Sequence, residues 1–278
     1  MSTQVISVTP MTISVITVTY NSAKTVADTM VSVAMQSYAD IEHLVIDGAS
    51  KDNTLDIVRS HARSQTRLIS ESDDGIYDAM NKGLLLASGE VVGFLNSDDL
   101  YADASVLEKV ANAFQDPAVE ACYADLVYVS KDNRRVVRNW KSRSFIKGDF
   151  AKGWCPAHPT FYVRKSVIER LGLFDRSYKL AADVELMMRY LERGQVRSVY
   201  IPHILVRMRV GGATNQSWRN IRKQNSEIFS ALRKNGVAFS AVKFWLLKVF
   251  SRARQYFFGY IFKKNILRSD FWKSRSAH

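Results

Sequence analysis

The chain of 278 residues has few of the features that mark several protein classes. It has two cysteines, Cys122 and Cys155, which are too few for a disulfide framework or a zinc cluster, so we expect a reducing compartment and two free thiols. Its 5 prolines and 13 glycines exclude a collagenous or disordered chain. No apolar run reaches the roughly 18 residues of a transmembrane helix, and the start has no signal-peptide pattern.

Glycine-rich phosphate loops are also missing. Neither Gly-x-Gly-x-x-Gly nor Gly-x-x-x-x-Gly-Lys occurs, which argues against hydride transfer and P-loop chemistry. No Gly-x-Ser-x-Gly nucleophile elbow occurs either. Cys155 and His158 lie close in sequence, but they are weak evidence for a thiol nucleophile because buried cysteines are far commoner.

Acidic residues are scarce at the C-terminal end. Residues 239–278 hold 9 Lys and Arg against 1 Asp or Glu, whereas residues 1–238 hold 30 against 26. Two thirds of the net charge of +12 therefore lies in the last forty residues. This distribution predicts a nearly neutral body and a basic tail that meets an anionic surface, either phospholipid or RNA.

Strands alternate with helices through the first part of the chain. The β-branched run at 13–19 predicts a strand buried on both faces, followed by a helix that Asn21 or Ser22 could cap. The expected strands are 13–19, 43–46, 68–70, 91–95, 121–130, 135–140 and 199–210, and the expected helices are 23–36, 53–61 (capped by Asp52), 76–87, 105–114, 166–171, 182–193 and the region after 217. This order predicts an α/β fold with a mostly parallel, Rossmann-like sheet flanked by helices, whose ligands bind beyond the carboxyl ends of the strands.

Two adjacent carboxylates, Asp98 and Asp99, follow a buried strand. They repel each other unless a cation lies beside them, so they favour Mg²⁺ or Mn²⁺ completed by diphosphate oxygens, with an ordinary capping turn as the equally weighted alternative. Asp47 ends an earlier strand, where a carboxylate can accept nucleoside donors, although a turn aspartate is again the alternative. Asp183 lies at a helix start, where it is a candidate general base or simply an acid that complements the helix dipole.

Five segments together resemble family 2 glycosyltransferases of the GT-A fold. They are residues 17–21 (TVTYN), 46–54 (IDGASKDNT), 74–83 (DGIYDAMNKG), 87–90 (ASGE) and 94–99 (FLNSDD). The resemblance covers about residues 11–212 and is closest to enzymes of exopolysaccharide and O-antigen assembly, including the colanic acid type. Five motifs in order are far more specific than any one of them.

The resemblance implies roles for particular residues. The expected nucleotide-sugar contacts are Thr19, Tyr20, Asp47, Asn81, Lys82, Asn96 and Arg209. Asp98 is the expected ligand of a divalent Mn²⁺ or Mg²⁺ ion, with Asp99 assisting, and an amide at Asn96 replaces the first carboxylate of the family's Asp-x-Asp element. Asp183 becomes the expected catalytic base, and His158 is expected near the acceptor, with a purely structural histidine as its alternative.

We expect residues 1–10 to form an N-terminal extension and 11–215 the GT-A domain, with 11–115 as its nucleotide-sugar half and 116–215 as its acceptor half. Residues 216–278 are expected to form a helical, basic and aromatic tail. Aromatic and basic residues with almost no acid favour a helix in a membrane interface, whereas packing on the catalytic domain and RNA binding are the alternatives.

The resulting hypothesis is an inverting glycosyltransferase that moves a single sugar from a nucleotide diphosphate sugar, expected to carry uridine, to a lipid-linked oligosaccharide. The acceptor is expected to be linked to a polyprenyl diphosphate in bacterial surface polysaccharide synthesis. We expect the protein at the cytoplasmic face of the inner membrane and expect no nucleic-acid partner. The Gln-x-x-Arg-Trp element of processive synthases is missing. Two alternatives stay open: an inactive nucleotide-sugar or polyanion-binding protein, which Asn96 motivates, and a nucleotidyltransferase.

Overall fold

The computed structural model describes residues 11–211 and 218–261. The expected extension at 1–10 and the last part of the tail, 262–278, lie outside the described residues. The strands are β1 (Ile13–Thr19), β2 (Ile41–Asp47), β3 (Thr66–Ser70), β4 (Val91–Phe94), β5 (Leu100–Tyr101), β6 (Ala121–Val129), β7 (Val136–Trp140), β8 (Tyr162–Arg164) and β9 (Ser198–Arg209). The helices are α1 (Val26–Ala34), α2 (Thr54–His61), α3 (Ile76–Leu86), α4 (Val106–Ala113), α5 (Lys165–Leu171), α6 (Ala182–Met188), α7 (Trp218–Lys234) and α8 (Ala241–Ile261). Short turns of helix are η1 (Phe150–Lys152), η2 (His158–Thr160) and the π-helical η3 (Arg189–Arg193).

The strands form one sheet in the order β3-β2-β1-β4-β8-β6-β9-β5, with β7 paired to β6. β1 to β4 are parallel, as predicted, whereas β8 is antiparallel to both of its neighbours. The register aligns Thr19 with Asp47, and Asp47 with Ser70. The loops after β1, β2 and β3 therefore leave the same edge of the sheet side by side.

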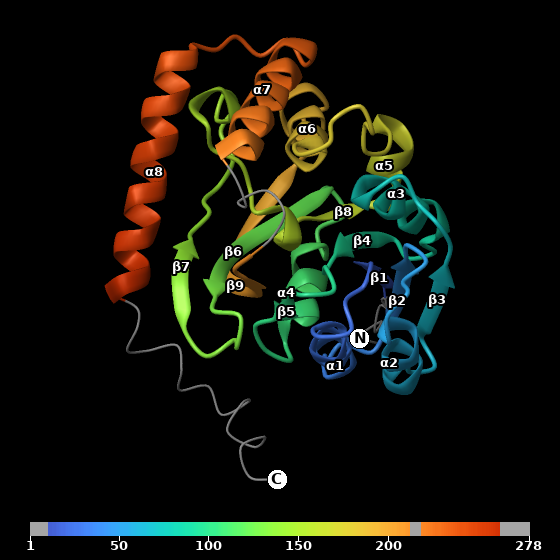
Figure 1. The fold of residues 1–278 in the computed structure, drawn as a ribbon. Coiled ribbons are helices and arrows are strands. Elements are labelled where there is room, and N and C mark those ends of the chain that lie inside the picture. Colours follow the sequence, from blue (N-terminus) through green and yellow to red (C-terminus); the bar gives the residue numbers. More distant parts are fainter. Residues whose placement is uncertain (1–10, 212–217, 262–278) are drawn as a thin grey trace, which may run out of the picture.

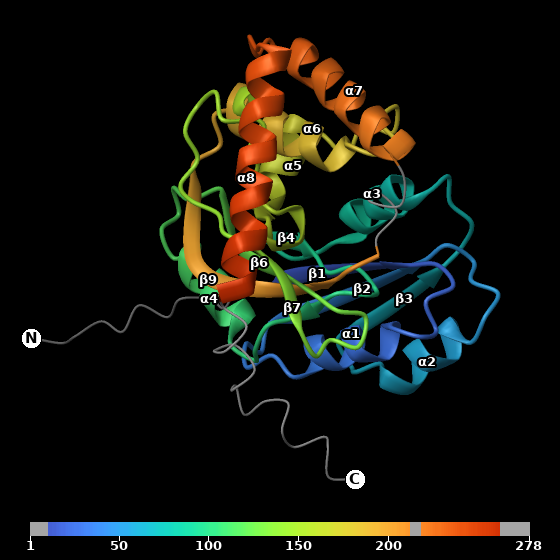
Figure 2. The ribbon, with the colours of Figure 1, turned by 60° about the vertical axis from the view of Figure 1, so that its left-hand side comes forward.

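Helices cover both faces of the sheet (Figures 1 and 2). The alternation along β1 divides the core: Ile13 and Val15 pack on the side of α4, whereas Ile16 and Val18 pack on the side of α3, α6 and α7. Both sets are buried, because a parallel strand covered on both faces has no solvent side. The predicted α/β fold with helices on both faces of the sheet is confirmed in this arrangement, although the strands after β4 add antiparallel pairs to the parallel ones.

The C-terminal helices pack against the rest of the fold. Ile228, Ala231 and Leu232 of α7 are buried in the same cluster as α3 and α6, and Phe244 of α8 is 1% exposed. α8 runs beside β7, as Figures 1 and 2 both show. Packing on the catalytic domain, one of the alternatives for the tail, therefore holds for α7 and for one face of α8. Of the described helices, none is both long and apolar enough to cross a bilayer.

Some local expectations were wrong. The two short strands β5 and β8 were not predicted. The side chains of Asn21 and Ser22 do not cap α1, because the Asn21 oxygen accepts the Lys51 amide at 2.9 Å and the Ser22 hydroxyl lies 2.9 Å from that of Ser97. Asp52 does accept the amide of Thr54, the first residue of α2, at 3.0 Å.

Gly83 lets α3 approach the sheet closely. A Cβ atom at this position would lie 2.5 Å from Cγ2 of Ile16, which is itself fully buried in β1. Neither the helix nor the central strand can move without opening the core, so the close approach depends on glycine.

We expect Gly83→Ala to lower the free energy of unfolding by about 1–3 kcal/mol, because the added methyl overpacks the contact with β1. On an exposed helix face the same change would instead stabilise by about 1 kcal/mol. Urea denaturation measures the sign. Leu85→Ala, at a position 70% exposed on the same helix, is the control. A stabilised Gly83→Ala variant would contradict the proposed contact.

Candidate active site

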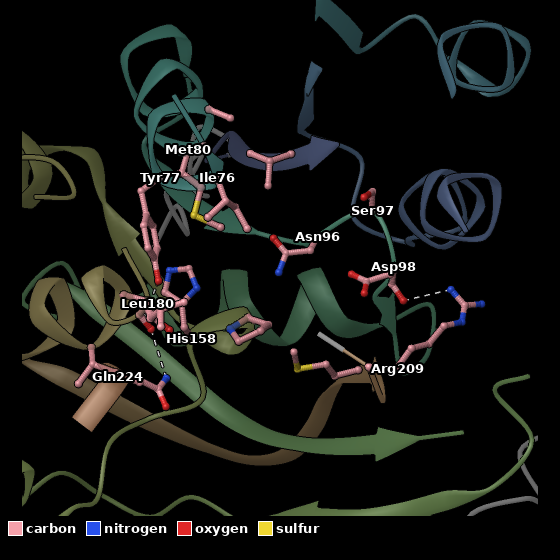
Figure 3. A pocket seen from close by; sticks show the side chains of 18 of the residues that line it. Ile76, Tyr77, Met80, Asn96, Ser97, Asp98, His158, Leu180, Arg209 and Gln224 are labelled. Carbon is pink, nitrogen blue, oxygen red and sulfur yellow. Dashed lines mark hydrogen bonds between the residues drawn. The ribbon is translucent and has the colours of Figure 1, made fainter. Parts of the chain in front are cut away.

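One large cleft, of about 1780 Å³, lies at the carboxyl ends of β1 and β4 (Figure 3). Its first wall comes from the loops after β1, β2 and β4 and from the start of α3. The opposite wall comes from β7, the 150–159 region, the start of α6 and both C-terminal helices. The cleft therefore joins the two halves of the chain, as the topology predicts for ligands of such sheets.

Asp47 organises the loops at one end of the cleft. Its carboxylate is fully buried and accepts hydrogen bonds from the Ser50 amide at 2.9 Å, the Ser50 hydroxyl at 2.5 Å and the Ser70 hydroxyl at 2.8 Å. The Ser50 hydroxyl in turn accepts the amide of Asn21 at 2.8 Å. These bonds tie the loop after β1 to the loop after β2.

The residues that face the cleft at this end are Thr19, Tyr20 and Gly48. Tyr20 is 60% exposed, and the buried hydroxyl of Thr19 meets no hydrogen-bond partner in the part of the chain that is described. Asp47 itself does not line the cleft. Its buried carboxylate is bonded to Ser50 and Ser70, and the expected direct contact between Asp47 and the nucleotide stays a prediction.

The Asn96-Ser97-Asp98-Asp99 segment leaves β4 with its side chains in different directions. Asn96 and Asp98 line the cleft, whereas Asp99 is fully buried and does not. Arg209 of β9 comes from far along the chain to the same place and donates to the backbone carbonyl of Asp98 at 3.0 Å (Figure 3). Arg209 also forms an ion pair with Asp28 of α1 at 2.5 Å.

Burial dominates the electrostatics of the two aspartates. It raises the pKa of Asp98, and the charge of Arg209 partly opposes this. It raises the pKa of Asp99 well above its ordinary value, and the charge of Asp98 adds to the effect. Burial thus disfavours the charged form of Asp99 beneath the site, and its expected role as an assisting metal ligand stays a prediction.

Asp98 is the residue that could hold a divalent ion in the cleft, as a single carboxylate and not as part of a cluster of metal-binding side chains. Among the described residues, no group of three or more His, Cys, Asp or Glu side chains could hold a metal. Asp98 nevertheless faces the cleft with a carboxylate whose ionisation a cation would favour, and the buried Asn96 amide oxygen has no hydrogen-bond partner within the described ranges. One carboxylate with diphosphate oxygens is a common environment for Mg²⁺ or Mn²⁺.

The other end of the cleft is built around Asp183, at the start of α6. The hydroxyl of Tyr77 donates to the Asp183 carboxylate at 3.1 Å, and both residues line the cleft. His158, 8% exposed, lies close enough that the charge of Asp183 raises its pKa, although burial lowers it overall. Three side chains from α3, α6 and η2 thus meet at one place.

Phe174 supports this group through ring contacts. Its ring stacks on Tyr77 with centroids 5.6 Å apart and meets His158 edge-on at 5.6 Å. Asn81 holds Phe174 in place: its amide nitrogen donates to the Phe174 carbonyl at 3.0 Å, and its oxygen accepts the Phe174 amide at 2.9 Å. Asn81 therefore acts on the cleft through Phe174.

Asn81 and Lys82 do not line the cleft, and their expected role in nucleotide-sugar binding stays a prediction. Residues Ile76, Tyr77 and Met80 supply the α3 face that lines it (Figure 3). The helical period turns the next two residues away. Asn81 is 8% exposed, and Lys82 donates to the Ser72 carbonyl at 2.7 Å and pairs with Glu71 at 2.8 Å.

Several lining residues were not singled out from the sequence. Asp73 lies in the loop after β3, at the same edge of the sheet as Asp47 at the end of β2, and that position could have identified it. Tyr77 lay within a quoted motif, but its bond to Asp183 spans 106 positions and left no local signal. The wall formed by Trp140, Gln224 and Phe244 has no motif at all.

A mixed α/β sheet with a cleft at its strand ends is an arrangement in which ligands commonly bind beyond the carboxyl ends of the strands. Residues 14–172 match the family model described as Glycosyl transferase family 2, and the chain belongs to that family. It is 32% identical over 197 residues to a "PGL/p-HBAD biosynthesis glycosyltransferase" of Mycobacterium tuberculosis, covering 69% of this chain and 74% of the relative. A second glycosyltransferase of that organism is 32% identical over 182 residues, which cover 64% and 68% of the two chains.

Solved structures show the same fold at low identity. S. aureus TarS 1–349 in complex with UDP-GlcNAc matches with a TM-score of 0.61 and 19% identity, over 89% of this chain and 73% of that one. The mannosyltransferase PcManGT from Pyrobaculum calidifontis, in complex with GDP-Man and Mn²⁺, matches with a TM-score of 0.58 and 20% identity, over 92% and 84%. The match to the longer TarS chain covers 44% of its length. This protein is thus a family 2 glycosyltransferase with the GT-A fold.

We expect Asn81→Ala to lower the free energy of unfolding by about 2 kcal/mol or more, because two buried backbone groups of Phe174 lose their partner. Nucleotide binding by the folded variant should be unchanged. Urea denaturation and calorimetric titration with nucleoside diphosphates measure the two effects, and Lys82→Ala is the control. Weakened nucleotide binding at unchanged stability would instead support a direct contact between Asn81 and the nucleotide.

Proposed function

We propose that this protein is an inverting, metal-dependent glycosyltransferase that moves one sugar from a uridine diphosphate sugar to a lipid-linked oligosaccharide of bacterial surface polysaccharide. The observation that carries this proposal is the division of one cleft. Asp98 and Arg209 lie at one end, Tyr77 with its partner Asp183 lies at the other, and Asn96 projects between them (Figure 3).

The donor occupies the end formed by the loops after β1, β2 and β4. Thr19 and Tyr20 face the nucleoside, and Asp73 beside Gly48 adds a carboxylate to the same wall. The diphosphate lies toward Asp98 and Arg209. A divalent ion bound at Asp98 would neutralise charge on the departing diphosphate. The family relationship and the nucleotide sugars named with the two solved structures support this placement.

Asp183 acts as the general base in the proposed reaction. Its carboxylate takes the proton of an acceptor hydroxyl while that oxygen forms a bond to the anomeric carbon of the sugar. The bond between this carbon and the diphosphate oxygen breaks, and its electron pair leaves with the nucleoside diphosphate. One displacement inverts the anomeric centre and needs no protein nucleophile. The Tyr77 hydroxyl holds the carboxylate in place by its hydrogen bond.

Asp183→Asn and Asp98→Asn should each lower the rate of transfer by about 10²–10⁴-fold, through loss of the base and of the metal ligand respectively. Turnover is measured with a panel of nucleotide sugars, a membrane lipid extract, and Mn²⁺, Mg²⁺ or EDTA. Asp183→Asn should still bind the donor. Asp56→Asn, in an exposed surface pair, is the control. Unchanged turnover of either variant refutes the role of that residue, and cleavage of a nucleoside triphosphate would favour nucleotidyl transfer.

The acceptor proposal also rests on α8. The side chains of Val242, Leu246, Val249 and Phe250 are 60–71% exposed, and their spacing of four, seven and eight residues places them on one helix face. Phe244 and Lys248, on another face, line the cleft. With the excess of basic residues after residue 238, the apolar face fits an anionic membrane surface. A lipid-linked acceptor would reach the cleft along this side, at the cytoplasmic face of the inner membrane.

Leu246→Glu combined with Phe250→Glu should weaken binding to phosphatidylglycerol vesicles at least about tenfold, because two large apolar side chains no longer enter the interface. Vesicle co-sedimentation measures the loss. The matched control is Leu85→Glu, an equally exposed leucine on α3. Equal binding of both variants, or preferred binding of RNA over vesicles, would contradict the membrane assignment.

A further inference from the structure

Glu227 of α7 makes a contact with the backbone just before the catalytic helix. Its Oε2 atom accepts the amide of Leu180 at 2.7 Å and the amide of Ala181 at 3.0 Å. These two residues directly precede α6, which carries Asp183 in its first turn. One carboxylate oxygen thus holds two consecutive backbone groups of the segment that leads into the base.

A second α7 residue holds the same segment from its carbonyl side. The Gln224 side-chain nitrogen donates to the Leu180 carbonyl at 3.2 Å (Figure 3). Gln224 and Glu227 are one helical turn apart, so the two contacts come from one face of α7. The segment is fixed through both polar groups of Leu180.

α7 is a firm support for these contacts. Ile228, next to Glu227, is 5% exposed, and Ala231 and Leu232 are fully buried in the main core. The side chain of Lys248 in α8 donates to Asn225 at 2.7 Å and so joins the two C-terminal helices. Glu227 cannot follow a movement of the α6 start without shifting this packed helix.

The charge of Glu227 also reaches the site. Together with Asp183, it raises the pKa of the Tyr77 hydroxyl, although burial has the larger effect. Glu227 therefore lies on the same side as the Tyr77 and Asp183 pair. It does not line the cleft, so its action on the reaction passes through the backbone of Leu180 and Ala181.

We propose that Glu227 is a positioning residue for the base: it fixes the entry of α6 and thereby the place of the Asp183 carboxylate in the cleft. This inference rests on the proposed role of Asp183. It also assigns a function in the active site to a helix that lies beyond residues 14–172, the part matched by the family model.

The paired variants Glu227→Gln and Glu227→Ala separate the contact from the charge. Both remove the charge, but the glutamine oxygen can still accept the two amides. We expect Glu227→Ala to lower kcat by roughly 10- to 100-fold at unchanged donor KM, since a small misplacement of a reacting group has effects of this size. Glu227→Gln should stay within about threefold of the parent enzyme. Ser226→Ala, exposed on the same helix, is the control.

A readout without turnover tests the geometry by itself. The charge of Asp183 raises the pKa of His158, so displacement of the base should lower that pKa further. We expect the His158 ring, followed by NMR and assigned with a His158→Gln variant, to titrate at lower pH in Glu227→Ala than in Glu227→Gln. Circular dichroism verifies that each variant is folded.

The outcomes distinguish this inference from the proposed function. Equal kcat and equal His158 titration in the two Glu227 variants would overturn the positioning role. If Asp183→Asn keeps full turnover, the role of Asp183 as base fails, while the His158 shift still reports whether Glu227 places it. Loss of activity in Glu227→Ala through a raised donor KM alone would also overturn the inference.

Discussion

The buried carboxylate of Asp47 is the interaction on which the donor end depends. A charged group with no exposure is tolerated only when its oxygens are fully engaged, and Ser50 and Ser70 supply these hydrogen bonds. These bonds fix the loop after β2 against β3. The Ser50 hydroxyl also accepts the amide of Asn21, which ties the loop after β1 to the same group. The surface presented to a nucleotide is therefore set before any ligand arrives.

The acceptor end is fixed by different means. Parallel strand ends cannot supply it, since Asp183 lies on a helix outside the sheet. Side chains from distant segments hold it instead: Tyr77 bonds to the carboxylate, and Asn81 fixes Phe174 against Tyr77 and His158. The GIYDAMN stretch of α3 thus has a structural explanation in which two of its polar members act on the far end of the cleft.

The sequence predicted well those features that depend on local pattern. β1 was found with both of its ends, because its β-branched run contains no charged residue, glycine or proline that would interrupt it. The place of Asp98 at a strand end followed from the same pattern. Asn81, Lys82 and Asp99 do not line the cleft, which a motif could not predict because it records which residues are present and not which side of the backbone they take. A single step along α3 or after β4 decides between cleft and core.

The contacts of the C-terminal helices could not be predicted at all. The composition of residues 239–278 indicated a surface-seeking tail, and the exposed face of α8 agrees with it. Phe244, however, is buried by β7 and α7 in a contact that no periodicity announces. A helix that packs on the fold with one face and meets solvent or another surface with the other carries apolar residues on both faces. Only the tertiary contacts then show which of its residues are buried and which are exposed.

The position of α7 has a consequence for recombining members of this family. A chimera joined after residue 172 would combine one enzyme's strands β1 to β8 and donor loops with another enzyme's α6, β9 and α7. The bonds within the second part, such as Glu227 to Ala181, would survive intact. The bond from Tyr77 to Asp183 would cross the junction, together with the ring contacts of Phe174 with Tyr77 and His158. The nucleoside side of the donor end should therefore be portable between relatives, whereas the contact of Arg209 with Asp98 and the catalytic alignment where α3 meets α6 must both be rebuilt.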